Sequence, residues 1–243
     1  MTPFVEAVIG AATEIYGRLR SGWVEEYGRH FGVGAGGDRT AGIDRMAESI
    51  YLEALSPFGA VDSEESGIVG SGEATIVLDP IDGSDNALSG LPYFGSSIAL
   101  ERGGRVEEAV VVNLANGEIF YRCEGAPMRG KIGERSFAPV VRRDAATVGV
   151  FEKAYAYPTL AERFLQRGMK FRSPGAVALS LAYAHDLQFV VFAGPRRRYD
   201  FAAALWMCEG LERIETDHLL IVSKEERIAS DLHDLLLHRK DQE

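Results

Sequence analysis

The sequence predicts two lobes of different fold class, an α+β lobe over residues 1–125 and an α/β lobe over residues 126–243. In the first lobe, two helical patterns precede a run of strand patterns joined by short turn signals, which is typical of an antiparallel meander. In the second lobe, short apolar strand patterns alternate with helical patterns, which favours an α/β arrangement. A loop-like segment from about residue 125 to 143 separates the two patterns.

Two helices are predicted at the start of the chain. Apolar residues recur at helical spacing from Val5 to Leu19, and a second apolar face runs from Gly42 to Ala54. Between them, residues 32–37 contain four glycines, which destabilise a regular helix or strand. This segment is either a linker or a mobile loop that borders a site.

A buried strand is predicted over residues 74–78, ending directly before Asp79. Three strand patterns follow at 94–101, 105–113 and 118–122, separated by the turn signals Gly103-Gly104 and Asn116-Gly117. The second lobe is predicted to contain strands at 147–151, 187–193 and 219–222 and helices at 160–167, 175–185, 201–209 and 225–238.

Composition excludes several classes of function. The net charge of −10 and the isoelectric point near 5.1 argue against binding to a nucleic-acid backbone. The apolar stretches fall short of the roughly 20 residues that cross a bilayer, and the start of the chain lacks a signal-peptide pattern. The two cysteines, Cys123 and Cys208, form no C-x-x-C motif. We therefore expect a cytoplasmic protein without a membrane, nucleic-acid or thiolate-zinc function.

The motif DPIDGS at residues 79–84 follows the predicted buried strand. Pro80 restricts the backbone at this point, so Asp79, Asp82 and the Ile81 carbonyl can be directed at one position. Such oxygen ligands suit Mg²⁺ or Mn²⁺ better than zinc. If Ser84 opens a helical turn, its free backbone N–H groups would receive phosphate oxygens. The alternative is a surface turn, because Asp, Pro, Gly and Ser all favour turns.

Further carboxylates occur at three other places in the sequence. Glu64 lies in the acidic segment 62–67, Asp38 follows the glycine-rich segment, and Asp200 follows the run Arg196–Arg198. Each has an ordinary structural interpretation, namely a solvated turn or, for Asp200, a helix N-cap. The carboxylates close in sequence to DPIDGS favour a metal site at that motif over a plain surface turn.

The DPIDGS motif, Glu64-Glu65 before it and YDFAA at 199–203 after it resemble the inositol monophosphatase / fructose-1,6-bisphosphatase superfamily. The order and spacing match, as does the segment 38–48, and the resemblance extends over nearly the whole chain. The short length and the serine after glycine are most similar to archaeal or bacterial dual-activity members. The resemblance implies a layered αβαβα sandwich of the sugar-phosphatase type and a homodimer or homotetramer.

The resemblance also implies ligands and roles. Two or three Mg²⁺ ions, which Mn²⁺ can replace, would be held by Glu64, Asp79, the Ile81 carbonyl, Asp82 and Asp200. Glu64 and the Ser84 hydroxyl would orient and deprotonate the attacking water, with Asp38 as a hydrogen-bond partner of Ser84. Phosphate would be bound by Gly83 and Ser84, and the substrate by a segment that contains Arg172, Gly175 and Ala176.

One departure from the superfamily concerns the substrate. Many inositol monophosphatases have a glutamate, which contacts inositol hydroxyls, seven residues before the aspartate that matches Asp200; this sequence has Ala193 there. Arg197 and its neighbours Arg196 and Arg198 could instead meet a second phosphate, since arginine suits bidentate phosphate contacts. That would favour fructose 1,6-bisphosphate.

The predicted function is Mg²⁺-dependent hydrolysis of a small phosphate monoester, either inositol monophosphate or fructose 1,6-bisphosphate or both. A nucleotide phosphatase acting on NADP or an adenosine bisphosphate, and a non-catalytic regulatory relative, remain open alternatives. A haloacid-dehalogenase-type phosphatase is disfavoured because its D-x-D motif places one residue between the aspartates, whereas two separate Asp79 from Asp82.

Overall fold

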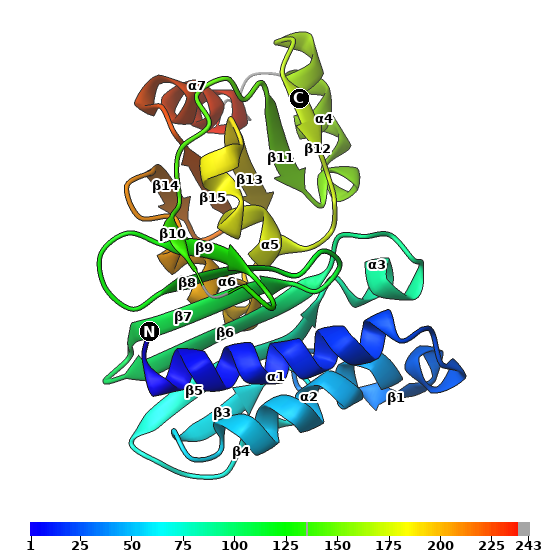
Figure 1. Ribbon diagram of the computed structural model, residues 1–243. Coiled ribbons are helices and arrows are strands. Elements are labelled where there is room, and N and C mark those ends of the chain that lie inside the picture. Colours follow the sequence, from blue (N-terminus) through cyan, green and yellow to red (C-terminus); the bar gives the residue numbers. More distant parts are fainter. Residues whose placement is uncertain (135, 238–243) are drawn as a thin grey trace.

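The computed structural model describes residues 1–134 and 136–237 of the chain. Helices α1 (Pro3–Arg20) and α2 (Gly42–Leu55) lie side by side over one face of an eight-stranded sheet (Figure 1). The first begins after Thr2, whose hydroxyl accepts a hydrogen bond of 3.3 Å from the backbone N–H of Val5. Both apolar faces predicted from the spacing are buried against the sheet.

The eight-stranded sheet has the order β10-β9-β8-β7-β6-β5-β3-β4. Its strands are β3 (Ala60–Ser63), β4 (Gly67–Val69), β5 (Ala74–Asp82), β6 (Gly95–Arg102), β7 (Arg105–Asn113), β8 (Glu118–Arg122), β9 (Met128–Lys131) and β10 (Ala138–Pro139). The predicted meander corresponds to the antiparallel run from β5 to β8, whereas β3 is parallel to β5.

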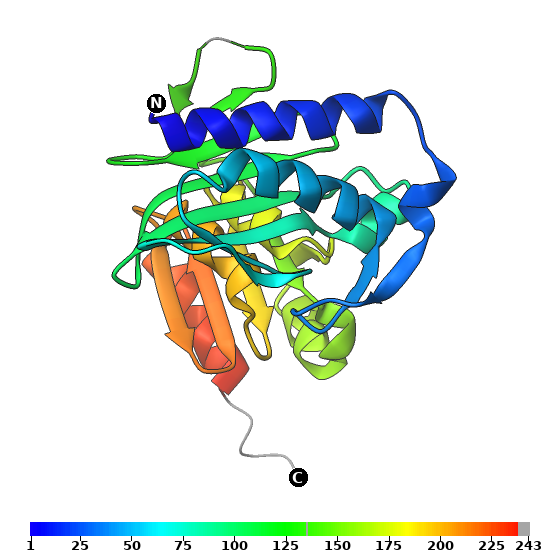
Figure 2. The same ribbon diagram turned by 90° about the horizontal axis from the view of Figure 1, so that it is seen from below.

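A five-stranded sheet of order β12-β11-β13-β15-β14 forms the second half of the molecule. Its strands are β11 (Val148–Glu152), β12 (Lys170–Arg172), β13 (Phe189–Ala193), β14 (Glu212–Thr216) and β15 (Leu219–Ser223). Helices α5 (Val177–Ala182) and α6 (Arg198–Trp206) lie between the two sheets, and α4 (Pro158–Gln166) and α7 (Glu226–Leu237) cover the outer face (Figures 1 and 2). The order helix, sheet, helix, sheet, helix confirms the αβαβα sandwich.

The core follows these layers. One apolar cluster fills the space between α1, α2 and the first sheet, a second surrounds α5 and α6, and a third lies under α4 and α7. Strand β5 contributes to two of them, because alternate side chains of a strand point to opposite faces. Ile76 and Leu78 face the first cluster and Val77 faces the second. The strand is therefore buried on both faces before it reaches Asp79.

Several segments differ from the sequence prediction. The glycine-rich segment is part of a two-stranded sheet of β1 (His30–Val33) and β2 (Arg39–Ala41), and the acidic segment 62–67 joins the paired strands β3 and β4. Strands β9 and β10 lie beyond residue 125 yet pair with the first sheet. The helix expected from residue 175 begins two residues later, because Gly175 has a φ of +84°.

The short helices are η1 (Glu25–Gly28), α3 (Ser84–Leu88), η2 (Ala154–Ala156) and η3 (Ala184–Asp186). The predicted end of the last helix, His238, lies outside the described residues. Within the described part of the chain, no helix combines the length and the apolar character needed to cross a membrane.

Candidate active site

Glu64 and Asp79 are brought together by two parallel strands. Strands β3 and β5 are paired through Ser63 and Leu78, so the residues that follow them emerge at the same edge of the sheet. The backbone N–H of Glu64 continues this pairing with a hydrogen bond of 2.9 Å to the Leu78 carbonyl. The sequence prediction missed β3, so it gave no physical reason for the proximity of the two carboxylates.

Asp200 reaches the same place from the second half of the chain. It lies in the first turn of α6, which packs against β5, β6 and β7. The start of this helix is fixed by the Ser97 hydroxyl on β6, which donates a hydrogen bond of 3.1 Å to the Tyr199 carbonyl. Asp200 is therefore a buried residue inside the helix, and the helix cap is Arg197.

Glu64, Asp79 and Asp200 each place one carboxylate oxygen within 4.8 Å of those of the other two. All three side chains are buried, with 7%, 2% and 2% of their surfaces exposed. Burial and the neighbouring carboxylates raise the pKa of Asp79 well above its usual value. Burial likewise raises the pKa of Glu64, to about 7, although Arg197 opposes the shift. The arrangement concentrates negative charge where solvent cannot screen it.

The chemistry of this cluster fits a divalent cation. The Asp79 carboxylate accepts no hydrogen bond from any residue that the structure describes, although it is almost completely buried. A buried carboxylate without hydrogen bonds is costly unless a cation is close. The pairing of β5 with β6 also shifts register between Asp79 and Asp82, so Ile81 lies in a bulge rather than in the regular ladder. Oxygen donors of this kind suit Mg²⁺ or Mn²⁺.

Arg197 supplies the nearest positive charge to the cluster. One terminal nitrogen of its guanidinium donates hydrogen bonds to Asp38 and Glu64, at 2.5 and 2.6 Å. Its other two nitrogens each donate to one oxygen of Asp200, both at 3.2 Å. The expected bond between Asp38 and Ser84 is absent from the described residues, because the Asp38 carboxylate is turned toward this guanidinium instead.

Asp82 has a different environment from Asp79. Its two carboxylate oxygens accept hydrogen bonds from the backbone N–H groups of Val177 and Leu179, at 3.0 and 3.1 Å. The structure therefore does not include Asp82 in the group of three close carboxylates. The expectation that Asp79 and Asp82 are directed at one position is only partly met, because the start of α5 orients Asp82. Burial still raises the pKa of Asp82, and the charge of Asp200 adds to this shift.

Gly83 and the segment 175–176 are in direct contact. Gly83 has a φ of +84°, and a Cβ atom at this position would lie 3.0 Å from the Ala176 Cβ and 3.1 Å from the Gly175 carbonyl oxygen. Only glycine fits such a left-handed conformation at such close approach. Asn86 strengthens the contact, because its side-chain amide donates hydrogen bonds of 2.7 Å to the Pro174 and Tyr93 carbonyls. The DPIDGS motif and the predicted substrate segment therefore form one unit.

The glycine-rich segment lies against the cluster. The backbone N–H of Gly36 donates a hydrogen bond of 2.7 Å to the Glu64 carbonyl, and a Cβ atom on Gly36 would lie only 2.5 Å from the Glu64 Cγ. Of the two interpretations of this segment, a loop that borders a site agrees with the structure.

Comparison with known proteins identifies the family of the chain. Residues 1–211 match the inositol monophosphatase family. The chain belongs to this family. It is 30% identical to a fructose-1,6-bisphosphatase/inositol-1-monophosphatase from Archaeoglobus fulgidus, over 82% of this chain and 78% of that protein. It is 31% identical to Nus factor SuhB of Escherichia coli K12, over 68% of this chain and 67% of that protein.

The fold of the chain is also similar to solved structures of the family. The crystal structure of extragenic suppressor protein suhB from Bartonella henselae superposes with a TM-score of 0.78 and 23% identity, over 98% of this chain and 100% of that chain. An identity this low supports the fold alone.

Three residues expected near the substrate in this family member lie away from the acidic cluster. Arg172 is exposed and lines a cavity of about 300 Å³ with Tyr93 and Pro174. Arg196 pairs with Glu215 at 2.7 Å. Arg198 pairs with Asp62 and Glu101, at 2.6 and 2.7 Å. Of the run 196–198, Arg197 alone contacts the acidic cluster within the described chain, through Glu64 and Asp200.

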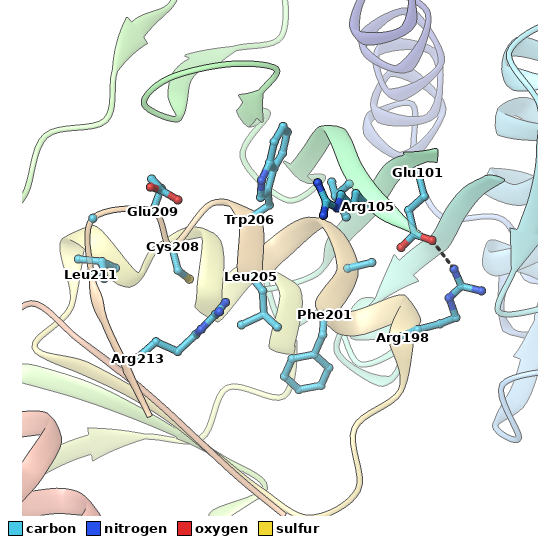
Figure 3. A pocket seen from close by; sticks show the side chains of 13 residues that line it. Glu101, Arg105, Arg198, Phe201, Leu205, Trp206, Cys208, Glu209, Leu211 and Arg213 are labelled. Carbon is cyan, nitrogen blue, oxygen red and sulfur yellow. Dashed lines mark hydrogen bonds and ion pairs between the residues drawn. The ribbon is translucent and has the colours of Figure 1, made fainter. Parts of the chain in front are cut away.

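Arg198 faces a separate pocket of about 940 Å³ on the other side of α6 (Figure 3). Figure 3 shows the Arg198–Glu101 pair at one end of this pocket and Trp206 with Arg105 above the helix. Of the residues that the sequence predicted near the substrate, Arg198 lines this pocket, whereas Glu64, Asp79 and Asp200 do not. It is therefore distinct from the acidic cluster.

Sequence reasoning missed Glu152, the last residue of β11. It is fully buried, and its carboxylate accepts hydrogen bonds from the Gly175 backbone N–H at 3.0 Å and from the Ser180 hydroxyl at 2.5 Å. Glu152 thus holds the segment around Gly175, and Asp82 holds the start of α5 that follows this segment. An acidic residue at the end of an apolar strand pattern was the available signal.

Proposed function

We propose that this protein is a Mg²⁺-dependent phosphatase that hydrolyses a small phosphate monoester, inositol monophosphate or fructose 1,6-bisphosphate. The observation that carries the proposal is the buried group of Glu64, Asp79 and Asp200, in which the Asp79 carboxylate accepts no hydrogen bond from the described residues. Family membership supports it, since the relatives include a named fructose-1,6-bisphosphatase/inositol-1-monophosphatase.

Glu64, Asp79, Asp200, the Ile81 carbonyl and, through its remaining lone pairs, Asp82 would hold two or three divalent ions. When bound, these ions offset the negative charge of the phosphoryl group and make water more acidic. Arg197 forms ion pairs with carboxylates of the acidic cluster, so the protein itself would supply a further positive charge near a bound phosphate.

Glu64 is well placed to take the proton of the attacking water. One of its carboxylate oxygens lies within 4.8 Å of those of Asp79 and Asp200, so a water held at this cluster would be close to a group able to accept its proton. Ser84 would orient the same water through its hydroxyl. Asp38 would become available to Ser84 only after its hydrogen bond to Arg197 is broken.

Phosphate binding is assigned to the start of α3. Gly83 precedes this helix in a left-handed conformation, and the first N–H groups of a helix have no partner within it. These groups and the Ser84 hydroxyl would receive phosphate oxygens. The alcohol part would lie along Gly175 and Ala176, which contact Gly83, with Arg172 at the outer cavity.

The test is phosphate release from inositol 1-phosphate, fructose 1,6-bisphosphate and NADP, with and without Mg²⁺, by the wild type and Asp79→Asn. We expect Mg²⁺-dependent release that the substitution abolishes, and Asp217→Asn, at an exposed position between β14 and β15, is the matched control. Release from NADP alone would favour the nucleotide-phosphatase alternative. No release from any ester would favour a regulatory role, an alternative that the similarity to a protein named Nus factor SuhB also keeps open.

We also propose that the protein is a homodimer or homotetramer in the cytoplasm. Size-exclusion chromatography with light scattering would measure the first property and cell fractionation the second. A monomer that is fully active would contradict the oligomeric part of the proposal alone.

A further inference from the structure

Arg198 connects the helix that carries Asp200 to two strands of the first sheet. It is the first residue of α6, two residues before Asp200. One terminal nitrogen of its guanidinium donates a hydrogen bond of 2.6 Å to Asp62 on β3, and the other donates one of 2.7 Å to Glu101 on β6 (Figure 3). Strand β5, which carries Asp79, lies between β3 and β6 in the sheet. The two carboxylates that accept from Arg198 therefore lie on either side of this strand.

Asp62 faces the layer in which α6 lies. It is paired in register with Val77 on β5, whose side chain belongs to the apolar cluster around α5 and α6. The Asp62 side chain is buried, and both of its oxygens accept a hydrogen bond from the start of α6. Oδ2 accepts from Arg198, and Oδ1 accepts from the Tyr199 hydroxyl at 3.1 Å. Strand β3 is therefore held to the first turn of α6 by two consecutive residues.

This contact is a second link between the segments that carry Glu64 and Asp200. Asp62 precedes Glu64 by two residues, and Arg198 precedes Asp200 by two residues. The first link is Arg197, which is bonded directly to both of these carboxylates. The partners of Arg198 in the described chain lie outside the group of three close carboxylates. A change at Arg198 can therefore move Asp200 relative to Glu64 without removing a candidate metal ligand.

The Arg198 ion pairs are better suited to fixing geometry than to adding stability. The arginine side chain is 45% exposed, and ion pairs at exposed positions usually contribute little to the free energy of folding. A guanidinium, however, presents its N–H groups in a rigid planar fork, so two carboxylate partners fix its direction as well as its distance. Both terminal nitrogens are used by Asp62 and Glu101, so the expected contact of Arg198 with a second phosphate is replaced by contacts within the protein.

We propose that Arg198 is a positioning residue that sets the separation of Asp200 from Glu64 and Asp79, and thereby the affinity of the acidic cluster for a divalent cation. The inference rests on the proposed function, because it requires a cation at this cluster. Residues that orient the ligands of a metal contribute to its affinity although they do not touch it. Here the ligands come from three segments far apart in the sequence, so their relative position depends on contacts such as that of Arg198 with Asp62.

The test measures the Kd of Mn²⁺ by titration calorimetry for the wild type, Arg198→Gln and Arg129→Gln. Arg129 on β9 is the matched control, because its guanidinium also joins two carboxylates, those of Glu118 and Asp186, at 2.6 Å each. We expect Arg198→Gln to raise the Kd by about tenfold or more and Arg129→Gln to leave it unchanged. The Tm of each variant in EDTA gives the structural cost of the change. An unchanged Kd in Arg198→Gln, or an equal rise in Arg129→Gln, would overturn the inference.

Milder variants test the same link in a protein that keeps Arg198 or its charge. Tyr199→Phe deletes only the hydroxyl that donates to Asp62, and it should raise the Kd by a smaller factor. Arg198→Lys should recover only part of the loss, because an ammonium lacks the planar fork. Asp62→Asn should weaken Mn²⁺ binding about as much as Arg198→Gln, and the double variant should add little, because both residues act through one contact. Fully additive losses would contradict the proposed link.

Phosphate release separates this inference from the proposed function. Mn²⁺ binding that depends on Arg198, without release of phosphate from any ester, would contradict the phosphatase proposal and support the inference. Metal-dependent release together with equal Mn²⁺ affinity in the wild type and Arg198→Gln would support the phosphatase proposal and overturn the inference. An absence of Mn²⁺ binding to the wild type would overturn the two together.

Discussion

The backbone N–H of Val177 donates a hydrogen bond of 3.0 Å to Oδ1 of Asp82, and this bond joins the two halves of the molecule. Asp82 ends the central strand β5 of the first sheet, and Val177 begins α5 in the layer between the sheets. The second carboxylate oxygen accepts from Leu179 in the same way. An acidic side chain at the start of a helix stabilises it through the free N–H groups and the helix dipole. The DPIDGS motif therefore joins the two halves of the molecule, in addition to placing carboxylates at the candidate site.

Asp82→Asn should therefore destabilise the protein even in EDTA. An amide provides one acceptor where the carboxylate provides two, and its NH₂ group would face a backbone N–H. We expect a loss of about 1–3 kcal/mol in the free energy of unfolding, the usual cost of an unsatisfied buried donor. Urea unfolding measures it, with Asp217→Asn in the exposed turn between β14 and β15 as the control. Equal stability of the two variants would mean that the hydrogen bonds to α5 contribute nothing net.

Asp79→Asn should have the opposite effect on the metal-free protein. Its carboxylate is buried among Glu64, Asp82 and Asp200 without a hydrogen bond from the described residues, so removal of the charge relieves repulsion. At pH 8 in EDTA we expect a gain of about 1 kcal/mol, or a rise in Tm of about 2–4 °C. With excess Mn²⁺ the wild type should be more stable than Asp79→Asn, because the wild type binds the ion more tightly. A lower Tm for the variant in EDTA would argue against this account.

Arg197 stabilises the same cluster through its hydrogen bonds to Asp38, Glu64 and Asp200. In EDTA at pH 8, Arg197→Gln should lose about 1–3 kcal/mol, less than the full cost of breaking a buried ion pair, because the arginine side chain is 32% exposed. Arg196→Gln is the matched control, because Arg196 pairs with the surface residue Glu215. We expect Mn²⁺ to raise the Tm of Arg197→Gln more than that of Arg196→Gln.

The layered fold and the DPIDGS site were predictable because local patterns determine them. The apolar run before Asp79 gives a buried strand, and the alternation of patterns in the second half gives an α/β arrangement. Strand β3 was missed because its four residues, Ala60–Ser63, carry an acid and a serine, and its pairing with β5 is a tertiary effect. The contact of Glu64 with Asp79 could be expected only from the family resemblance.

The ion pairs of the arginines could not be predicted from sequence. Arg196, Arg197 and Arg198 are consecutive, yet they contact Glu215, the acidic cluster and Asp62 with Glu101, respectively. Their directions depend on where α6 begins and on strands far away in the chain. The partners of Glu152 and the left-handed conformation of Lys153, with a φ of 56°, have the same origin, since both depend on the position of the segment around Gly175.

The dependence of stability on pH should reveal the protonation of the Glu64 carboxyl group. Burial raises its pKa from 4.5 to about 7, so between these pH values the folded state retains a proton that the unfolded state has released. Without metal, stability should therefore fall as the pH rises from about 4.5 to 7, by up to about 1.4 kcal/mol per pH unit for one group. Glu64→Gln should reduce this slope in urea titrations. A stability that rises over this interval in both proteins would contradict the assignment.

The left-handed backbone of Lys153 gives a final prediction about stability. Glycine adopts positive φ without a Cβ clash, so Lys153→Gly should relieve a cost of about 1 kcal/mol. The gain is partly offset by the greater freedom of glycine in the unfolded chain, and we expect a Tm equal to or about 1–3 °C above that of the wild type. Lys153→Gln should stay at or below the wild-type Tm, because it keeps the strain. If Lys153→Gly melted well below the wild type, contacts of the lysine side chain, such as that of its ammonium with the Phe192 ring, would outweigh the strain of the backbone.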